Sequence, residues 1–273
     1  MSKTILITGS TDGIGLATAK MLASQDHTVL LHGRRASKLA TVETLLSGLA
    51  GKGNVASYVA DLSRMADVEL LASAIIENHA IVDVLINNAG AFKASDPVTS
   101  DGLDVRFAVN AIAPYLLTQR LIPHIPTSGR VINVSSAAQS PVDLEALSGQ
   151  GRLSEDFTAY AQSKLALTMW SRRWALALPE EGPVIIAVNP GSLLGSKMVK
   201  EGFGIAGKDL QIGAEILTRL AIADEFATAS GQYFDNDQGQ FAAPHSDALN
   251  PQKCESVVNA IETVLANIKS QHP

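Results

Sequence analysis

The sequence has one cysteine, no cluster of like charges and no long apolar run, and each shortage excludes a class of protein. Because Cys254 is the single cysteine among 273 residues, no disulfide can form within the chain. The formal net charge is −6 without any charged block, which argues against a nucleic-acid partner because phosphate binding needs clustered Lys and Arg. No run of about 20 apolar residues could span a bilayer, and no basic amphipathic helix suggests a membrane-surface role.

The amino-terminal residues also lack a secretory signal. The first three residues lead directly into the apolar stretch 4–7, with no long apolar region and no cleavage site. Together with the single cysteine, this predicts a protein of the reducing cytoplasm. Hydrophobic residues make up 46% of the chain, which is enough for one sizeable core, and we expect no bound metal.

Short β-branched runs alternate with longer helical patterns along the chain. The apolar runs lack a period of two, as expected of strands that helices cover on both faces. No linker rich in Pro, Gly or Ser divides the chain, so we predict a single domain, 1–273, built on a doubly wound parallel sheet of about seven strands with helices on both faces. The predicted strands are 4–8, 27–32, 55–59, 82–87, 130–134, 184–188 and 232–234, and the predicted helices are 13–24, 37–49, 65–79, 103–122 (bent at Pro114), 158–178 and 251–268.

Two stretches, about 137–157 and 192–208, are predicted to be irregular. In an open α/β sheet, ligands bind beyond the carboxyl ends of the strands, where both stretches begin. Several glycines make the second stretch easy to reshape. We therefore expect both to form loops on the substrate side.

A glycine-rich turn follows the first predicted strand. Gly9 permits a sharp turn, Gly13 lets the backbone approach a pyrophosphate, and Gly15 lets the next helix pack close to the sheet. Free N–H groups at the start of that helix favour phosphates. A tight turn without a ligand is the alternative, but the order of strand, turn and helix predicts a Rossmann-type dinucleotide site.

The second predicted strand ends in His32-Gly33-Arg34-Arg35. Proteins that bind NAD usually place an acidic residue here to contact the ribose hydroxyls. With no carboxylate to repel a 2′-phosphate and two guanidinium groups to bind it, this end favours NADP(H), with NAD(H) as the alternative. Asp12, in the phosphate turn, adds a negative charge that opposes this preference.

Six short motifs, taken in order, resemble those of the short-chain dehydrogenase/reductase family over essentially the whole chain. The run Gly231-Gln232-Tyr233-Phe234-Asp235 and a long separation between Ser136 and Tyr160 are similar to the retinol-dehydrogenase-like and WW-domain-oxidoreductase-like branch. The motifs are 8–15, Asn87-Asn88-Ala89-Gly90, Asn110, Val134-Ser135-Ser136, Tyr160-Ala161-Gln162-Ser163-Lys164 and Asn189-Pro190-Gly191.

The chemistry of carbonyl reduction explains the catalytic residue types. The carbon needs a hydride and the oxygen needs a proton, which Tyr160 can supply, although a free phenol has a pKa near 10. Lys164 lies one helical turn away on the same face, and its cation, with the charge of oxidised nicotinamide, would lower the pKa of Tyr160. Ser136 would hydrogen-bond the substrate oxygen. The resemblance assigns this serine role to Ser136 rather than to Ser135.

The resemblance implies further roles. Asn110 would hold a water that links Lys164 to solvent, and Lys164 would also hold the nicotinamide ribose. Asp61 falls where the family contacts adenine, and Ser196 is the hydroxyl that we expect at the nicotinamide carboxamide. Asn87 would also bond backbone at the end of its strand. The predicted cofactor residues are Gly9, Ser10, Thr11, Asp12, Gly13, Ile14, Gly15, Arg34, Arg35, Asp61, Leu62, Asn87, Ala89, Gly90, Tyr160, Lys164, Pro190, Gly191, Ser192 and Ser196.

We predict an NADP(H)-dependent oxidoreductase that acts on a small carbonyl or alcohol of low charge, with Tyr160 as general acid and base. A cofactor sensor or scaffold without turnover is the alternative, although it would not need a proton donor. An epimerase of the extended relatives would need a larger substrate domain after Pro190. The apolar helix 158–178, with Trp170 and Trp174, often forms a dimer interface in the family, so we expect a homodimer or homotetramer, with a monomer as the alternative.

The Arg34→Ala variant tests the cofactor preference. It should weaken NADPH binding by about 1.5–3 kcal/mol, the scale of a charge-assisted hydrogen bond, and leave NADH binding almost unchanged. Titration of both cofactors against both proteins measures this. Equal affinity of the unaltered protein for NADPH and NADH would contradict the predicted preference.

Overall fold

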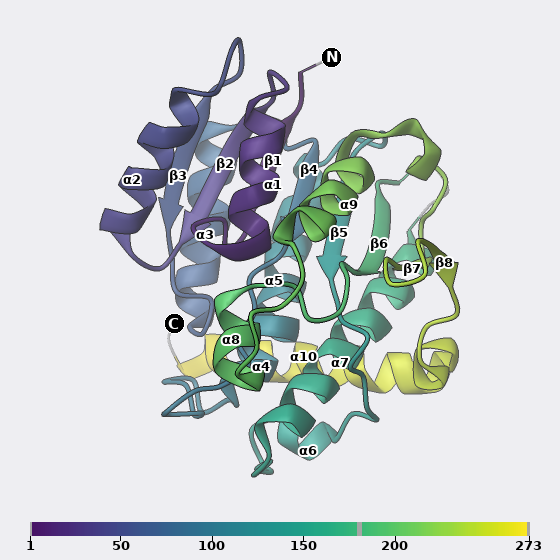
Figure 1. The fold of residues 1–273 in the computed structure, drawn as a ribbon. Coiled ribbons are helices and arrows are strands. Elements are labelled where there is room, and N and C mark those ends of the chain that lie inside the picture. Colours follow the sequence, from purple (N-terminus) through teal and green to yellow (C-terminus); the bar gives the residue numbers. More distant parts are fainter. Residues whose placement is uncertain (1, 179–181, 272–273) are drawn as a thin grey trace.

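A single sheet of eight strands forms the centre of the computed structural model, which describes residues 2–178 and 182–271 (Figure 1). The strands are β1 (Thr4–Ile7), β2 (Thr28–Gly33), β3 (Val55–Val59), β4 (Val84–Asn87), β5 (Arg130–Val134), β6 (Val184–Asn189), β7 (Tyr233–Asp235) and β8 (Gln240–Ala242). Their order is β3-β2-β1-β4-β5-β6-β7-β8, and all pairs are parallel except β7 with β8. The predicted Rossmann-type sheet is confirmed, with one antiparallel edge strand more than expected.

Helices cover both faces of the sheet (Figure 1). They are α1 (Gly13–Ala23), α2 (Ala36–Ser47), α3 (Met65–Asn78), α4 (Val105–Phe107), α5 (Ala113–Leu121), α6 (Leu144–Leu147), α7 (Asp156–Ala177), α8 (Lys197–Phe203), α9 (Leu210–Ile222) and α10 (Pro251–Gln271). Side chains of α1, α2 and α9 share one core with the sheet, and those of α3, α5, α7 and α10 share the other. Among the described helices, none is long and apolar enough to cross a membrane.

Among the described residues, three α-helices and one strand lie where the sequence predicted none. The stretches expected to be irregular contain the short helices α6 and α8, and β8 is a three-residue edge strand without a buried apolar run. Helix α9 was missed although Asp209 caps its first turn. Its Ile216, Leu217 and Leu220 follow helical spacing and are buried against the sheet. The local signals for α9 were therefore present in the sequence.

The helix predicted over 103–122 is interrupted. Helix α4 ends after one turn, a π-helical turn over Ala108–Ile112 follows, and α5 begins at Ala113. Pro114 has no N–H to donate to the Asn110 carbonyl four residues earlier, so the α-helical pattern cannot continue through this point. The N–H of Ala113 instead donates to the Ala108 carbonyl, five residues back. The interruption thus lies at Asn110, one of the predicted catalytic residues, as is common for π-helical turns.

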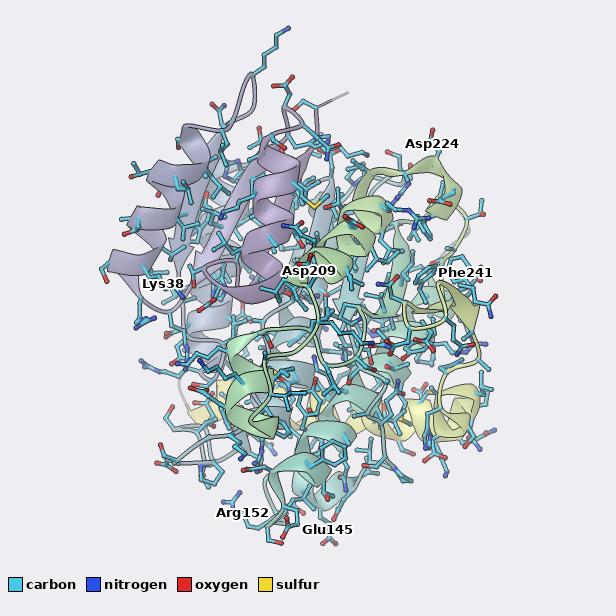
Figure 2. The ribbon with its side chains drawn as sticks, viewed as in Figure 1. Lys38, Glu145, Arg152, Asp209, Asp224 and Phe241 are labelled. Atoms are coloured by element: carbon cyan, nitrogen blue, oxygen red, sulfur yellow. The ribbon has the colours of Figure 1, made fainter. Side chains whose placement is uncertain are left out.

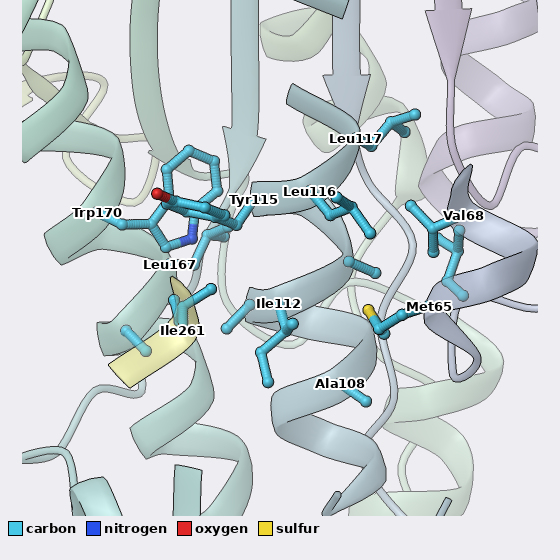
Figure 3. Packing of buried hydrophobic residues seen from close by; sticks show 14 of the residues in the cluster. Met65, Val68, Ala108, Ile112, Tyr115, Leu116, Leu117, Leu167, Trp170 and Ile261 are labelled. Carbon is cyan, nitrogen blue, oxygen red and sulfur yellow. The ribbon is translucent and has the colours of Figure 1, made fainter. Parts of the chain in front are cut away.

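Helix α10 packs against α7, and Figure 3 shows Ile261 of α10 near Leu167 of α7. Ile261 of α10 is fully buried in the same core as Leu167 and Trp170 of α7. Tyr115 of α5 joins them, with its ring 5.5 Å from that of Trp170 and its hydroxyl donating to Glu262 of α10 at 2.7 Å. The apolar face of α7 that suggested an oligomer is therefore covered by the chain itself. A homo-oligomer stays a prediction, but the apolar face of α7 no longer supports it.

His32 braces the turn between β1 and α1. Its side chain is 2% exposed, and its Nδ1 accepts a hydrogen bond from the N–H of Gly9 at 3.1 Å. The neutral ring then carries its hydrogen on Nε2, which lies 3.1 Å from the Ala60 carbonyl oxygen. Burial lowers the pKa of His32 to about 4. The ring is therefore neutral at physiological pH and holds the turn and the residue after β3 together.

The Ile261→Ala variant tests the docking of α10. Removing this fully buried side chain should cost about 2–5 kcal/mol in the free energy of unfolding, because the cavity cannot close completely. Ile212→Ala on α9 is the matched control, since Ile212 is 42% exposed and its loss should cost less than about 0.5 kcal/mol. Urea unfolding measures both. Equal costs would mean that α10 does not dock as described.

The pH dependence of stability tests His32. The pKa of about 4 in the folded protein lies below the unfolded value of about 6.5, so at pH between these values only the unfolded chain takes up the proton. The stabilisation is complete above pH 6.5 and is lost as the pH falls toward 4, by about 2 kcal/mol between pH 7 and pH 4.5. His32→Gln should show a correspondingly smaller loss in urea unfolding. An unchanged pH dependence in His32→Gln would contradict the assignment.

Candidate active site

The predicted site residues that follow strands lie at the carboxyl ends of β1 to β6, and those nearest the reaction centre follow β4, β5 and β6. Ligands bind at this edge of α/β sheets because the loops that follow the strands open there. Helix α8 lies over the edge: a Cβ on Gly13 would come within 3.6 Å of Ser196, and one on Gly90 within 3.3 Å of Met198. The site is thus formed by the strand ends below and by α8 above.

The turn between β1 and α1 has the backbone shape that a pyrophosphate requires. Gly9 and Gly13 have φ angles of 65° and 53°, in the left-handed region that favours glycine. A Cβ on Gly15 would lie 2.4 Å from Nδ2 of Asn88 and 2.5 Å from the Gly9 carbonyl oxygen, so only glycine allows α1 to approach the sheet this closely. The turn and the free N–H groups of α1 therefore fit the phosphates of a dinucleotide.

The side chains between these glycines serve the protein itself. Ser10 is fully buried, and both its N–H and its hydroxyl pair with the backbone of His32. Thr11 lies against Gly33, where a Cβ would come within 2.8 Å of the Thr11 methyl carbon. Ile14 packs into the core on the α9 face. Of the predicted cofactor residues, Ser10 is thus committed to β2.

Asp12 does not act as the free negative charge that we expected. Its carboxylate accepts from the N–H of Gly13 at 2.8 Å and pairs with Lys38 of α2 at 2.6 Å. Figure 2 labels Lys38 on α2. The hydrogen bond from Lys38 lowers the pKa of Asp12. Arg34 and Arg35 are both exposed at the end of β2. Lys38, which the sequence analysis missed, thus neutralises Asp12 and removes the objection to a 2′-phosphate beside the two arginines.

Of the two cofactor residues predicted after β3, Asp61 is used in a turn and Leu62 lies in the core. Asp61 closes the turn after β3, because one of its oxygens accepts from the N–H and the hydroxyl of Ser63 at 3.0 Å and 2.9 Å. The Leu62 side chain is 3% exposed and belongs to the core. Next to this turn lies an open cavity of about 540 Å³, lined by Arg34, Ser63, Arg64, Val105 and residues of the 93–100 loop.

Asn87 ends β4 and Asn88 follows it, and Asn88 takes the backbone-bonding role that was expected of Asn87. Asn87 is 2% exposed and donates to Asn133 and Thr118 inside the protein, not to backbone at the strand end. Asn88 makes the backbone bonds instead, donating to the carbonyls of Thr8 and Gly9 at 2.9 Å and 3.2 Å. Side chains on a strand alternate between faces, so the residue after Asn87 reaches the turn. The sequence motif located this pair, but only the structure distinguished its members.

Asn110 holds the segment that follows these asparagines. Its Oδ1 accepts from the N–H of Ala91 at 2.7 Å, and its Nδ2 donates to the carbonyl of Ala91 and to Ser163 of α7, both at 2.9 Å. A Cβ on Gly90 would lie 3.5 Å from this Oδ1 and 3.9 Å from Nζ of Lys164. The side chain of Asn110 therefore keeps only one lone pair for the predicted water, and small residues at 89 and 90 leave room beside Lys164.

Tyr160 and Ser136 meet at the end of β5. The side-chain hydrogen bond from Ser136 lowers the pKa of Tyr160, but burial has the larger effect and raises it. The net change is therefore a raised pKa, because the hydroxyl loses solvation on burial, and not the lowering that was expected beside Lys164. That the charge of oxidised nicotinamide lowers the pKa of Tyr160 stays a prediction. The Tyr160 phenol is therefore protonated at neutral pH and can donate a proton.

Lys164 is buried beside Tyr160. It is 3% exposed, its Nζ lies 5.7 Å from the centre of the Tyr160 ring, and it donates to the Val134 carbonyl at 2.7 Å. Burial lowers the pKa of Lys164 to about 8, so the ammonium remains mostly charged at neutral pH. Ser135 is also buried, and its hydroxyl pairs with Thr168 of α7 at 2.7 Å. This leaves Ser136 as the serine on the Tyr160 side, as the resemblance implied.

The loop after β6 is fixed by the turn between β7 and β8. Asp237 of this turn accepts from both the N–H and the hydroxyl of Ser192, and Asn236 donates to the Pro190 carbonyl at 2.9 Å. Gly191 has a φ of 122°, which the loop needs to turn past the strand end. Neither Asp237 nor Asn236 was predicted, because nothing local in the sequence connects residues more than 40 positions apart.

Helix α8 lies against the Phe92 ring, which in turn contacts the Tyr160 ring. The Phe92 ring meets the Tyr160 ring edge to face at 5.2 Å, and a Cβ on Gly202 of α8 would come within 2.5 Å of Phe92. Ser196 caps α8, accepting from the N–H of Val199 at 3.2 Å, and lies against Gly13. The structure thus places Ser196 beside the phosphate turn, whereas its expected contact was with the nicotinamide carboxamide.

Comparison with known proteins assigns these features to one family. The family model for short chain dehydrogenases matches residues 3–204. Human retinol dehydrogenase 13 is 31% identical over 263 residues, which cover 90% of this chain and 80% of the relative, so the predicted likeness to retinol dehydrogenases is confirmed.

Two solved structures extend the match. An uncharacterized protein from Mycobacterium paratuberculosis is 25% identical with a TM-score of 0.78, covering 96% of this chain and 92% of that one. A short chain dehydrogenase from Shigella flexneri complexed with NADP is 26% identical with a TM-score of 0.68, covering 86% of this chain and 97% of that one. The chain therefore belongs to the short chain dehydrogenase family and is an NAD(P)-binding oxidoreductase.

Proposed function

We propose that the protein uses NADP(H) to move a hydride to or from the carbon of a small, weakly charged carbonyl or alcohol. The observation that carries the proposal is a half-buried Tyr160 and a buried Lys164 that lie beside Ser136 at the strand end, next to the glycine-rich turn. A protein that only senses the cofactor has no need of a proton donor. The set therefore favours turnover over sensing.

The residues present fit a phosphorylated dinucleotide. Gly9 and Gly13 would receive the pyrophosphate, since their left-handed backbone leaves no side chain in its way. Arg34 and Arg35 would bind the 2′-phosphate, and the pairing of Asp12 with Lys38 keeps a free carboxylate from opposing it. The Shigella flexneri relative complexed with NADP supports this choice.

Tyr160 provides the proton chemistry. When bound, the nicotinamide supplies or accepts the hydride. Tyr160 donates its hydroxyl proton to the substrate oxygen during reduction and removes a proton from the alcohol during oxidation. Ser136 donates a hydrogen bond to the same oxygen, and this bond strengthens as negative charge develops there.

Lys164 and Asn110 support Tyr160. We expect the buried Lys164 cation, together with the positive charge of oxidised nicotinamide, to stabilise the phenolate that remains after proton transfer. Asn110 holds Ser163, whose hydroxyl also donates to the Tyr160 carbonyl at 2.7 Å. The π-helical turn and the first half of α7 are thereby joined, and both catalytic side chains on α7 keep their positions.

The Tyr160→Phe variant tests the proposal. It removes the proton donor but keeps the ring, so turnover should fall by about 10²–10⁴-fold, the range for a positioned general acid. NADPH affinity should change little. The measurement is NADPH oxidation with a panel of aldehydes and ketones that includes retinal, because one relative is named a retinol dehydrogenase.

Tyr58→Phe is the control. Tyr58 lies on the edge strand β3, which β2, β1 and β4 separate from β5, and its hydroxyl pairs with His79 at 2.7 Å. This variant should keep normal turnover. NADPH binding without turnover of any carbonyl in the unaltered protein would instead indicate a sensor. Near-normal reduction by Tyr160→Phe would leave a cofactor site but would reject Tyr160 as the acid.

A further inference from the structure

Tyr233 on β7 is a buried tyrosine that the proposed chemistry does not use. Its side chain is 7% exposed, and its hydroxyl donates to the carbonyl oxygen of Ser136 at 3.1 Å. Strand β6 lies between β5, which ends just before Ser136, and β7. The bond therefore depends on the length of the tyrosine side chain and on its terminal hydroxyl. Nothing in the general chemistry of hydride transfer requires a hydroxyl here.

Besides its side-chain hydrogen bond with Tyr160, Ser136 accepts three hydrogen bonds that fix its position. Its carbonyl oxygen accepts from Tyr233 and also from Nε2 of Gln139 at 2.9 Å, and its Oγ accepts from the N–H of Ala138 at 3.1 Å. The two carbonyl bonds fix the peptide that follows Ser136, and the third fixes the direction of its side chain. The hydroxyl hydrogen is then left for the side on which Tyr160 lies.

Packing alone does not hold this segment. A cavity of about 220 Å³ adjoins it, lined by Ala137, Gln139, Tyr233, Asp235, Ala243 and His245. Where a backbone segment borders open space, its position depends more on hydrogen bonds than on neighbouring side chains. The two donors to the Ser136 carbonyl are therefore the groups that keep residues 136–139 from shifting into the cavity.

Tyr233 is a dependable donor. Burial raises the pKa of its hydroxyl, and the negative charge of Asp235 adds to this rise. The hydroxyl consequently stays protonated at any pH at which Tyr160 could act. A phenylalanine at this position would keep the ring, which fills the same volume, and would remove only the bond.

We propose that Tyr233 is a positioning residue, which holds the catalytic serine Ser136 through the bond to its backbone carbonyl. The inference rests on the proposed function, because it requires that Ser136 act on the substrate oxygen. Tyr233 touches neither substrate nor cofactor in this role. Its effect on turnover passes entirely through Ser136.

The Tyr233→Phe variant is the first test. Its turnover should fall by about 5-fold, the scale of one net hydrogen bond, while NADPH affinity and KM for the carbonyl stay within about 2-fold. Tyr115→Phe is the matched control, because Tyr115 is also buried and its hydroxyl donates one bond, but to Glu262 on the outer helix. It should keep normal turnover and lose only stability.

A second measurement separates positioning from a general structural role. In a Ser136→Ala background, Tyr233→Phe should have no further effect on turnover, because the group that it positions is gone. Gln139→Leu removes the other donor to the same carbonyl, together with the side-chain hydrogen bond between Gln139 and Tyr233, and it should behave in the same way. It also serves as the test if Tyr233→Phe does not fold.

Three outcomes are informative. A 5-fold loss that disappears in the Ser136→Ala background supports the inference. Unchanged turnover in Tyr233→Phe, or equal losses in both backgrounds, overturns it while leaving the proposed function intact, provided that Ser136→Ala itself lowers turnover. Normal turnover in Ser136→Ala would instead remove the serine from the proposed chemistry, and this inference would fail with it.

Discussion

The burial of the Lys164 ammonium is the constraint on which the candidate active site depends. A cation that is 3% exposed needs oxygen partners close by. Nζ of Lys164 donates to the carbonyl of Val134 at the end of β5, at 2.7 Å. Its pKa of about 8 reflects the lost solvation. The charge can remain there only while α7 stays close against the end of β5, and contacts in distant parts of the chain maintain that approach.

A chain of buried polar side chains fixes α7 and α5 on the sheet. Asn133 of β5 donates to Ser171 of α7 at 2.7 Å and accepts from Asn87 of β4 at 2.8 Å, and Asn87 also donates to Thr118 of α5 at 3.1 Å. A shift of either helix would leave these groups unpaired, which is costly inside a protein. Helix α10 adds apolar contacts from outside. The hydrogen bonds to Asn133 and Thr118 explain why the Asn87 side chain is buried in the protein, although its motif suggested a contact with the cofactor.

The hairpin of β7 and β8 also fixes the loops that follow β5 and β6. From one short edge element, Tyr233 reaches Ser136 while Asn236 and Asp237 hold Pro190 and Ser192. The segments on both sides of the reaction centre are thus tied to the same hairpin. The hairpin comes late in the sequence, so the substrate side is completed only when β7 has paired with β6.

Much of the site could be predicted because its signals are local. The glycine-rich turn shows itself between a strand and a helix, and Tyr160 and Lys164 share a helix face because they are four residues apart. Tertiary structure alone decided what those residues experience. Lys38 neutralises Asp12 across 26 positions, burial raises the pKa of Tyr160, and Tyr233 reaches Ser136 over an intervening strand. Spacing along the chain carries periodicity, whereas charge pairing and desolvation depend on which distant segments the fold brings into contact.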